Sequence, residues 1–255
     1  MKNYIIVIAG SLLTSCAFAN PFAGAYVTGA LGGISTDFHI KGNANITVPG
    51  EGNILNVPNN SNVYANNILG TIGLGYAYGC RDFILGIQGD VNFFNTNRTQ
   101  TGTFSEIGGL ISLNSNLKAQ LKNSLDILFR PGWLMDPSTL LYGLIGASFG
   151  NFQVSQSASF QENTGGLLIN SNTGSSESAW RTGFTVGLGV QQYIWKNISA
   201  ALEYSYTDYG SLSLTNGSSA PILVVGETIG TLNGKVNQAK AFTNSVSLRL
   251  FYTFF

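Results

Sequence analysis

The sequence predicts an all-β chain that folds into an eight-stranded, antiparallel, up-and-down transmembrane β-barrel. Three observations predict this fold class. The 255 residues are 44% hydrophobic but only 9% charged, whereas a soluble domain carries roughly 25% charged residues. Apolar residues alternate with small or polar ones over long stretches, as expected for strands with two different faces. The connections between these stretches alternate between short and long, as in a barrel built from hairpins.

The composition also excludes several classes of protein. The 12 Lys and Arg residues balance the 12 Asp and Glu residues, and there is one His, so we expect no basic surface for nucleic acid. The two Cys residues are too few for a disulfide framework. Beyond the N-terminal segment no apolar run reaches the roughly 18 residues that a membrane-spanning helix needs. A membrane protein of this composition must therefore cross with strands.

The N-terminal segment has the pattern of an export signal. Lys2 precedes an apolar run over residues 4–13, and Ala17-Phe18-Ala19 fits a small-residue cleavage site. We therefore predict a signal peptide over residues 1–19 and a barrel domain over residues 20–255. An alternative stays open, because Leu13-Thr14-Ser15-Cys16 resembles a lipobox, which would make Cys16 a lipidated N-terminus.

Eight segments alternate with period two. In the third of them, Phe83, Leu85 and Ile87 alternate with Gly86 and Gln88, so one face suits lipid and the other is small or polar. The orientation of the fifth segment stays open, because both of its faces are apolar. The predicted strands cover residues 26–38, 68–78, 83–93, 117–133, 139–151, 181–194, 198–207 and 246–254.

The fourth segment admits two interpretations. Leu117, Leu121 and Leu125 lie four residues apart, which is also the spacing of a helix over residues 116–125. We favour a strand, because the alternation continues to Trp133. This interpretation places one set of apolar residues on a single face: Leu117, Ala119, Leu121, Leu125, Ile127, Phe129 and Trp133.

The lengths of the connections indicate which end of the barrel faces the periplasm and which faces the outside of the cell. Turns near residues 80, 137 and 196 are short, whereas residues 39–66, 95–116, 152–179 and 210–243 form long segments rich in Asn, Ser, Thr and Gly. Short periplasmic turns and long extracellular loops are typical of bacterial outer-membrane barrels. Aromatic residues near the strand ends predict the two interfacial girdles. The predicted girdle residues are Trp133, Trp180, Trp195 and Tyr252.

Several segments resemble the family of small eight-stranded outer-membrane barrels, the OmpA-like and opacity-like surface proteins of the porin family. The longest of them joins two strands by a turn, carries Glu203 on the inward face and closes with Tyr-Thr-Asp-Tyr-Gly. The segments are YVTGALGG (26–33), LGIQGDVNFF (85–94), RPGWL (130–134), LLYGLIGASFG (140–150), GFTVGLGVQQYIWKNISAALEYSYTDYG (183–210) and VSLRLFYTF (246–254). The resemblance implies a non-enzymatic protein of the bacterial outer membrane.

The resemblance also implies a C-terminal signal for the barrel-assembly machinery. Family members end on an outward Phe, and Phe254 has that parity, with Tyr252 two residues before it. Phe255 follows as an extra residue, so the register of the signal stays open between Phe254 and Phe255.

Charged residues on the inward parity predict a closed interior. An eight-stranded barrel is just wide enough for side chains to fill it, and buried charges need partners. We predict a stacked ion-pair network centred on Arg130 and Glu203; a gated path for small ions is the alternative. The inward charged residues are Asp90, Asp126 and Glu203 against Arg130, Arg181 and Arg249.

The sequence offers little for catalysis or cofactors. His39, the sole His, lies near Asp37, and a hydrolase or acyltransferase would need a nucleophile beside it. No cluster suggests a metal. The glycine-rich stretches over residues 73–79 and 183–189 lack a following helix, so they do not fit a dinucleotide site and suit close packing inside a narrow barrel.

The predicted function is therefore structural support or surface interaction. The expected partners are outer-membrane lipid or lipopolysaccharide, the assembly machinery, and host or surface ligands at the long loops. A small pore or a passage for hydrophobic ligands is the alternative, and a barrel hydrolase or acyltransferase ranks third.

Overall fold

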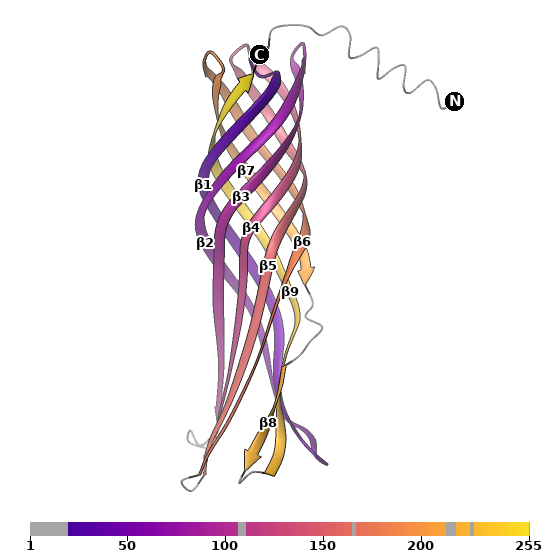
Figure 1. Cartoon of the computed structure of the whole chain (residues 1–255), viewed down its shortest axis with the longest axis vertical. Coiled ribbons are helices and arrows are strands. Elements are labelled where there is room, and N and C mark those ends of the chain that lie inside the picture. The colour runs from indigo at the N-terminus through magenta and orange to yellow at the C-terminus, as the bar shows by residue number, and fades with distance from the viewer. Residues whose placement is uncertain (1–19, 107–110, 165–166, 213–217, 225–226, 255) are drawn as a thin grey trace, which may run out of the picture.

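The computed structural model describes residues 20–106, 111–164, 167–212, 218–224 and 227–254, which form nine strands (Figure 1). None of these residues forms a helix long and apolar enough to cross a membrane. The predicted signal peptide, with Cys16, lies outside the described residues. The strands are β1 (Gly24–Val48), β2 (Gly52–Cys80), β3 (Phe83–Glu106), β4 (Ile111–Asp136), β5 (Thr139–Thr164), β6 (Leu167–Trp195), β7 (Ile198–Leu212), β8 (Ser218–Val224) and β9 (Glu227–Phe254).

Eight of the strands close into a ring. Neighbours pair antiparallel in the order β1 to β7 and then β9, and β1 pairs with β9 to close the barrel. The additional strand, β8, pairs with β9 beyond the end of β7 and lies outside this ring. The eight-stranded up-and-down barrel is therefore confirmed, and the helical alternative for residues 116–125 is excluded, because they lie within β4.

Three short turns join strands at one end. Arg81 and Lys196 have φ values of 54° and 48°, the left-handed backbone that tight hairpin turns require. In the third turn Asp136 Oδ1 accepts hydrogen bonds from the backbone N–H of Ser138 (2.8 Å) and from its hydroxyl (2.7 Å). The hydroxyls of Ser138 and Thr139 hold the pKa of Asp136 below its usual range. The predicted turns near residues 80, 137 and 196 are confirmed.

The four segments predicted as long loops are mostly strand instead. Seven of the strands contain 24 to 29 residues, whereas a tilted membrane span needs about 9–11. A strand of 25 residues, such as β1, is about 80 Å long at about 3.3 Å per residue. The polar segments fold as hairpins because apolar residues recur on their inner side.

The ring of hydrogen bonds does not extend along the whole length of the strands. Among the described residues, β2 and β3 pair only between the turn and Gly70 opposite Phe93, and β6 and β7 only as far as Phe184 opposite Asp208. Beyond these points the strands form two separate sheets, one of β2, β1, β9, β8 and the end of β7, and one of β3, β4, β5 and β6. The barrel therefore continues as a two-layer β-sandwich.

The two parts can be named by their residues. The part next to the short turns is called the proximal barrel, and the part beyond the two seams is called the distal sandwich. The proximal barrel comprises residues 24–33, 68–93, 124–149, 183–208 and 245–254, and the distal sandwich comprises the described residues of 34–67, 94–123, 150–182 and 209–244.

The two parts have opposite polarity. In the proximal barrel apolar side chains point outward, and Leu31 and Leu188 are 72% and 58% exposed. In the distal sandwich they point inward: Phe38 and Leu117 are fully buried. The ring of Phe38 in β1 lies 5.9 Å, between centroids, from that of Phe152 in β5, so the two sheets pack face to face.

In β4 a bulge moves the apolar side chains from one face of the strand to the other. Leu121 pairs with Phe152 and Ser124 pairs with Gly150, so β4 contains one more residue than β5 between these pairs. Leu121 is consequently buried whereas Leu125 is exposed. The prediction that Leu117 to Trp133 share one face is wrong, because an inserted residue moves every later side chain to the other face.

The bulge is stabilised by a neighbouring strand. The Thr96 hydroxyl on β3 donates a 3.1 Å hydrogen bond to the Leu121 carbonyl and accepts one of 3.1 Å from Thr36 on β1. A buried carbonyl displaced from the ladder needs such a partner. The Thr36 to Thr96 bond also connects the two sheets where the sandwich begins.

Candidate functional site

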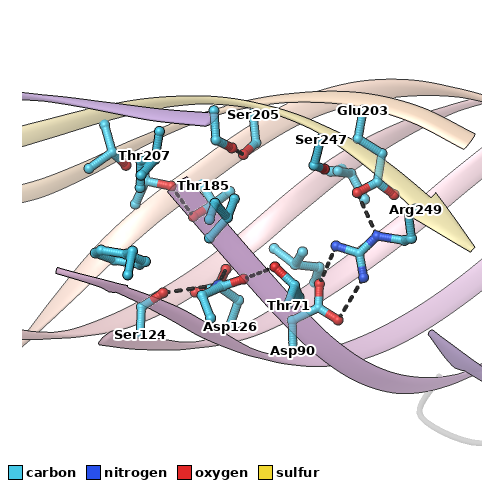
Figure 2. A pocket seen from close by; sticks show the side chains of 18 of the residues that line it. Thr71, Asp90, Ser124, Asp126, Thr185, Glu203, Ser205, Thr207, Ser247 and Arg249 are labelled. Carbon is cyan, nitrogen blue, oxygen red and sulfur yellow. Dashed lines mark hydrogen bonds and ion pairs between the residues drawn. The ribbon is translucent and has the colours of Figure 1, made fainter. Parts of the chain in front are cut away.

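The interior of the molecule contains a polar layer between two apolar clusters. The proximal cluster, near the short turns, contains the rings of Phe22, Tyr26, Tyr142 and Phe251. The distal cluster belongs to the sandwich and includes Phe38. Buried side chains with hydroxyl, amide or charged groups lie between them (Figure 2).

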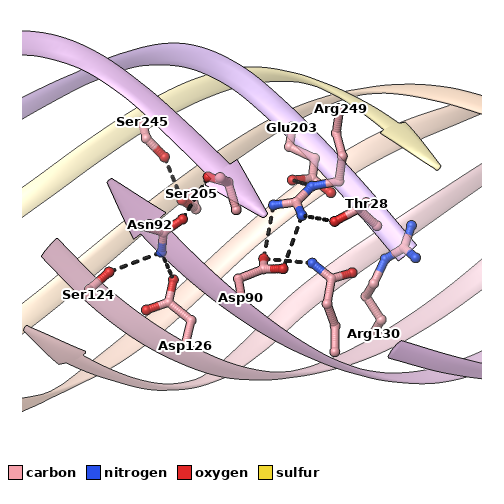
Figure 3. A network of polar contacts seen from close by, with 12 residues as sticks. Thr28, Asp90, Asn92, Ser124, Asp126, Arg130, Glu203, Ser205, Ser245 and Arg249 are labelled. Atoms are coloured by element: carbon pink, nitrogen blue, oxygen red, sulfur yellow. Dashed lines mark hydrogen bonds and ion pairs between the residues drawn. The ribbon is translucent and has the colours of Figure 1, made fainter. Parts of the chain in front are cut away.

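Arg249 on β9 is the centre of the polar layer. Its Nη2 lies 2.9 Å from Asp90 Oδ2, and its Nε lies 2.7 Å from Glu203 Oε2. Nη1 donates to Asp90 Oδ1 at 3.1 Å and to the Thr28 hydroxyl at 2.8 Å (Figure 3). The guanidinium therefore binds one carboxylate with two nitrogens and the other with a third, and connects strands on opposite sides of the lumen.

Neighbouring residues orient the two carboxylates. Gln88 Nε2 donates to Asp90 Oδ2 at 2.7 Å, and the Tyr142 hydroxyl donates to Glu203 Oε1 at 2.6 Å. Gly73 faces Asp90, and a Cβ at this position would overlap the Asp90 carboxylate. The predicted role of the glycine-rich stretch in close packing is confirmed at this position.

Asp126 on β4 has polar partners, but no cation of the described residues lies within ion-pair distance of it. Its Oδ2 accepts a 2.6 Å hydrogen bond from Asn92 Nδ2, and its Oδ1 accepts one from the Ser148 hydroxyl. Asn92 Oδ1 accepts from Thr71 at 2.7 Å. The prediction that each inward acid pairs with an arginine is therefore wrong for Asp126, because hydrogen bonds from Asn92 and Ser148 take the place of the ion pair.

Arg130 on β4 lies in an aromatic cage between the polar layer and the short turns. Its Cζ is 3.9 Å from the ring centroid of Tyr142 and 4.6 Å from that of Phe251. Nη2 donates to Gln191 Oε1 at 2.7 Å, and Nη1 donates to the Tyr26 hydroxyl at 3.5 Å. Among the described residues no carboxylate lies within ion-pair distance. Cation–π contacts therefore take the place of an acid.

The prediction that Arg130 and Glu203 form the centre of the network is wrong. Arg130 and Glu203 do not form a direct ion pair, and Tyr142 lies between them, because it packs against the guanidinium and donates to the carboxylate. Gly75 and Gly189 face the cage, and a Cβ at either would overlap the ring of Tyr26 or Tyr142. The small residues thus make room for the large ones.

The sixth predicted charge lies elsewhere. Arg181 on β6 is half-buried at the start of the distal sandwich, and its Nε has no partner among the described residues. It takes no part in the Arg249 network. The sequence placed Glu203 and Arg249 at one level and Asp90 at a higher one, whereas the structure brings all three together. The sequence missed Gln88 and Tyr142, whose inward parity was the available signal.

A small cavity remains inside the polar layer. It offers about 40 Å³ to the centres of water molecules, which is room for a few waters. Asp126, Glu203 and Arg249 are among its lining residues (Figure 2). Tyr209 and Phe94, which belong to the distal cluster, also line it. The interior is therefore largely filled by side chains.

The predicted girdle residues all lie on the outer face. Trp133, Trp180, Trp195 and Tyr252 are exposed. Phe254 is also exposed, and it pairs with Ala25 where β9 closes the ring. Phe255, the third residue of the expected assembly signal, lies outside the described residues.

His39 lies on the outer face of the distal sandwich. Its Nε2 is 3.0 Å from Asp37 Oδ2, and its ring packs edge-on against Phe242 with 5.4 Å between centroids. The described residues contain no group of three or more His, Cys, Asp or Glu side chains suited to a metal.

Comparison with known proteins identifies the family. The model of the outer membrane protein beta-barrel domain matches residues 5–254. The chain belongs to this family. A 22 kDa outer membrane protein of Rhizobium leguminosarum bv. viciae is 28% identical over 142 residues, which are 56% of this chain and 53% of that protein. The match thus spans about half the length of this relative. The family and this relative place the chain in the bacterial outer membrane, as predicted.

Solved outer-membrane proteins resemble the chain more distantly. Ail, the attachment invasion locus protein of Yersinia pestis, is 15% identical, with a TM-score of 0.35 over 91% of this chain and 100% of that chain. OprG of Pseudomonas aeruginosa is 11% identical, with a TM-score of 0.39 over 91% and 97%. The outer membrane protease OmpT of Escherichia coli is also 11% identical, with a TM-score of 0.40 over the same shares.

Proposed function

We propose that this family member is a non-enzymatic surface protein whose closed barrel anchors and displays the distal sandwich outside the cell. Outer-membrane barrels place their short turns in the periplasm, which directs the distal sandwich outward. The observation that carries the proposal is the change of polarity along the strands. An outer face that suits lipid gives way to one that suits water, over a hydrophobic core that keeps the hairpins together.

The filled interior supports an anchoring role. Arg249 connects Asp90 and Glu203 across the lumen, and an apolar cluster lies on each side of this layer. Opening a path would break buried ion pairs and expose apolar side chains, both of which cost free energy. We infer that Asp90, Asp126, Arg130, Glu203 and Arg249 hold the barrel closed.

A hexapeptide epitope inserted at two turns tests the display. In the turn at Gly50, between β1 and β2, the epitope should bind antibody on intact cells. In the turn at Pro137, between β4 and β5, it should bind only after permeabilisation. Antibody binding at Pro137 alone on intact cells would reverse the proposed orientation. Binding at neither site, with both variants assembled, would contradict display.

A small gated pore is the second candidate, and the polar cavity beside Asp126 favours it. Planar-bilayer conductance of the purified protein separates the two. The closed-barrel proposal expects no steady conductance for the wild type, whereas a large steady conductance would support the pore. An Arg249→Ala variant that conducts while the wild type does not would identify the network as the barrier.

The proposal excludes a hydrolase or acyltransferase based on His39. Catalysis would need a nucleophile within hydrogen-bond reach of the imidazole, and the described contacts of His39 are Asp37 and Phe242. We expect a His39→Ala variant to leave lipid composition and ester hydrolysis unchanged in cells. A change in lipid composition or a loss of ester hydrolysis in this variant would overturn the non-enzymatic assignment.

Two partners follow from the proposed role. We infer that the assembly machinery binds the outward face of the C-terminal strand, where Tyr252 and Phe254 lie with their rings 5.1 Å apart between centroids. We also infer that host or surface ligands meet the distal sandwich, whose outward side chains are mainly amides and hydroxyls. Nucleic acid is not among the expected partners, because the formal net charge is zero.

A further inference from the structure

Charges are unevenly distributed between the two halves of the distal sandwich. The distal parts of β2 to β5, over residues 52–69, 94–105, 112–124 and 150–161, contain no Asp or Glu and three cations, Arg98, Lys118 and Lys122. The distal parts of the remaining strands, together with the turn between β1 and β2, carry both signs: Asp37, Glu51, Glu177 and Glu227 against Lys41, Arg181, Lys235 and Lys240. The two acids of the first half, Glu106 and Glu162, lie beyond these ranges at the far ends of β3 and β5. Next to the apolar band this half therefore carries only cations, whereas the other half is balanced.

The three cations lie on two paired strands and are exposed. Lys118 on β4 pairs with Thr99, the residue after Arg98 on β3, and Lys122 lies one residue beyond Leu121, which pairs with Thr96. All three side chains are exposed. Because like charges on neighbouring strands repel one another, this grouping suits an anionic partner.

Arg98 is fixed in place by a contact across the seam between β2 and β3. Its Nε donates a 2.8 Å hydrogen bond to the carbonyl of Tyr64 on β2. This bond occupies a backbone group on a strand edge without using Nη1 or Nη2. The guanidinium is therefore held at this seam, on the strand that pairs with the one carrying Lys118 and Lys122.

The cations lie directly beyond the apolar band. The last exposed apolar residues are Phe93 on β3 and Leu125 on β4; Lys122 lies three residues past Leu125, Arg98 five past Phe93, and Lys118 seven past Leu125. At about 3.3 Å per residue and a tilt near 40°, these Cα atoms are roughly 8 to 18 Å above the band. Long cationic side chains reach back toward the interface, which is the level of lipid head groups.

We propose that Arg98, Lys118 and Lys122 form a binding surface for the phosphate groups of outer-leaflet lipid, the head groups of lipopolysaccharide. Arg and Lys bind phosphate oxygens through charge-assisted hydrogen bonds, and the segments of β3 and β4 around these cations, residues 94–105 and 112–124, contain no carboxylate that would compete for them. The proposal rests on the outward orientation of the distal sandwich. It assigns the lipid contact to one side of the barrel, so the balanced half stays free for other ligands.

Binding of fluorescent diphosphoryl lipid A to the purified full chain in zwitterionic detergent micelles tests this surface. The Lys118→Gln/Lys122→Gln variant should bind lipid A about tenfold more weakly, since each cation near a lipid surface contributes a several-fold effect. Arg98 stays intact, because its Nε also holds the Tyr64 carbonyl. The matched control, Lys41→Gln/Lys235→Gln, removes the same charge from the balanced half and should bind within about twofold of the wild type.

Three results would overturn the proposal. Unchanged binding by Lys118→Gln/Lys122→Gln would show that these lysines do not bind lipid A. An equal loss in both double variants would indicate an effect of net charge alone. Tighter binding to a soluble sulfated polysaccharide than to lipid A would assign the surface to a different polyanion. The epitope at Gly50 stays accessible in each of these cases if the display function holds, so the two proposals fail separately.

Discussion

The proximal barrel and the distal sandwich are built from the same strands, but they bury different kinds of side chain on the inward face. In the proximal barrel Leu188 faces outward and Arg249 faces inward, whereas in the distal sandwich Phe38 faces inward and Lys118 outward. Lipid outside the barrel allows a polar interior, because the hydrophobic residues are already in an apolar medium. Water outside the sandwich requires a hydrophobic interior. A strand that passes from lipid to water must therefore move its apolar side chains from the outward face to the inward face.

Deleting Asn123 tests the change of face most severely. Without the extra residue of β4, either Leu117 and Leu121 turn toward water or Leu125 turns into the polar lumen. We expect the variant not to assemble, as judged by loss of the heat-modifiable folded band in electrophoresis. The Asn123→Ala substitution keeps the residue count and should assemble normally. Normal assembly of the deletion would contradict the role of the bulge.

Removing Arg249 tests the polar interior. The Arg249→Ala variant leaves Asp90 and Glu203 buried without a cation and should lower the free energy of unfolding by about 3–5 kcal/mol. Urea titration of the protein in lipid vesicles measures this loss. The exposed Lys41→Ala variant should change it by less than about 0.5 kcal/mol. A loss for Arg249→Ala as small as that of the control would mean that the network contributes little.

Removing Phe38 tests the apolar interior of the distal sandwich. The Phe38→Ala variant should cost about 3 kcal/mol, because it leaves a cavity between the sheets. Backbone hydrogen exchange should increase around Phe38 and Phe152 and stay unchanged around Arg249. The Asn66→Ala variant, at an exposed position of the neighbouring strand, serves as the control. Equal acceleration in both regions would show that the sandwich does not open independently of the barrel.

The smallest expected effect concerns the turn at Asp136. The hydroxyls of Ser138 and Thr139 hold the Asp136 pKa below its usual range. A depressed pKa stabilises the folded state above the ordinary Asp pKa and loses this effect as pH falls through the folded value. The Asp136→Asn variant should therefore lose slightly more stability at pH 7 than at pH 3. Unfolding midpoints at the two pH values measure it, and a larger loss at pH 3 would contradict this sign.

The sequence predicted the proximal barrel better than the distal sandwich. Lipid-facing strands carry continuous outward apolar residues, so Leu85 and Leu188 were placed on the correct face. In the distal segments the abundant Asn, Ser and Thr concealed inward residues such as Ile40 and Phe152, and these segments were interpreted as loops. The bulge at Asn123 carries no Gly or Pro, so nothing in the sequence marked the change of parity.

The interior network was partly predictable for a similar reason. Inward parity identified Asp90, Glu203 and Arg249 as lumen residues, but the partner of each depends on strand register and on side-chain length. Register brings Arg249 between the two carboxylates, and the ring of Tyr142 separates Arg130 from Glu203. Neither relation follows from counting residues from a turn.

Accessibility mapping along β4 tests the change of face directly. Each of residues 116–129 is replaced in turn by a spin-labelled cysteine in a cysteine-free background, and collisions with oxygen and with a water-soluble nickel chelate are measured in lipid vesicles. Oxygen collisions should peak at residues 125, 127 and 129, and nickel collisions at residues 116, 118, 120 and 122, with the phase changing at Asn123. A single unbroken parity from residue 116 to residue 129 would contradict the account.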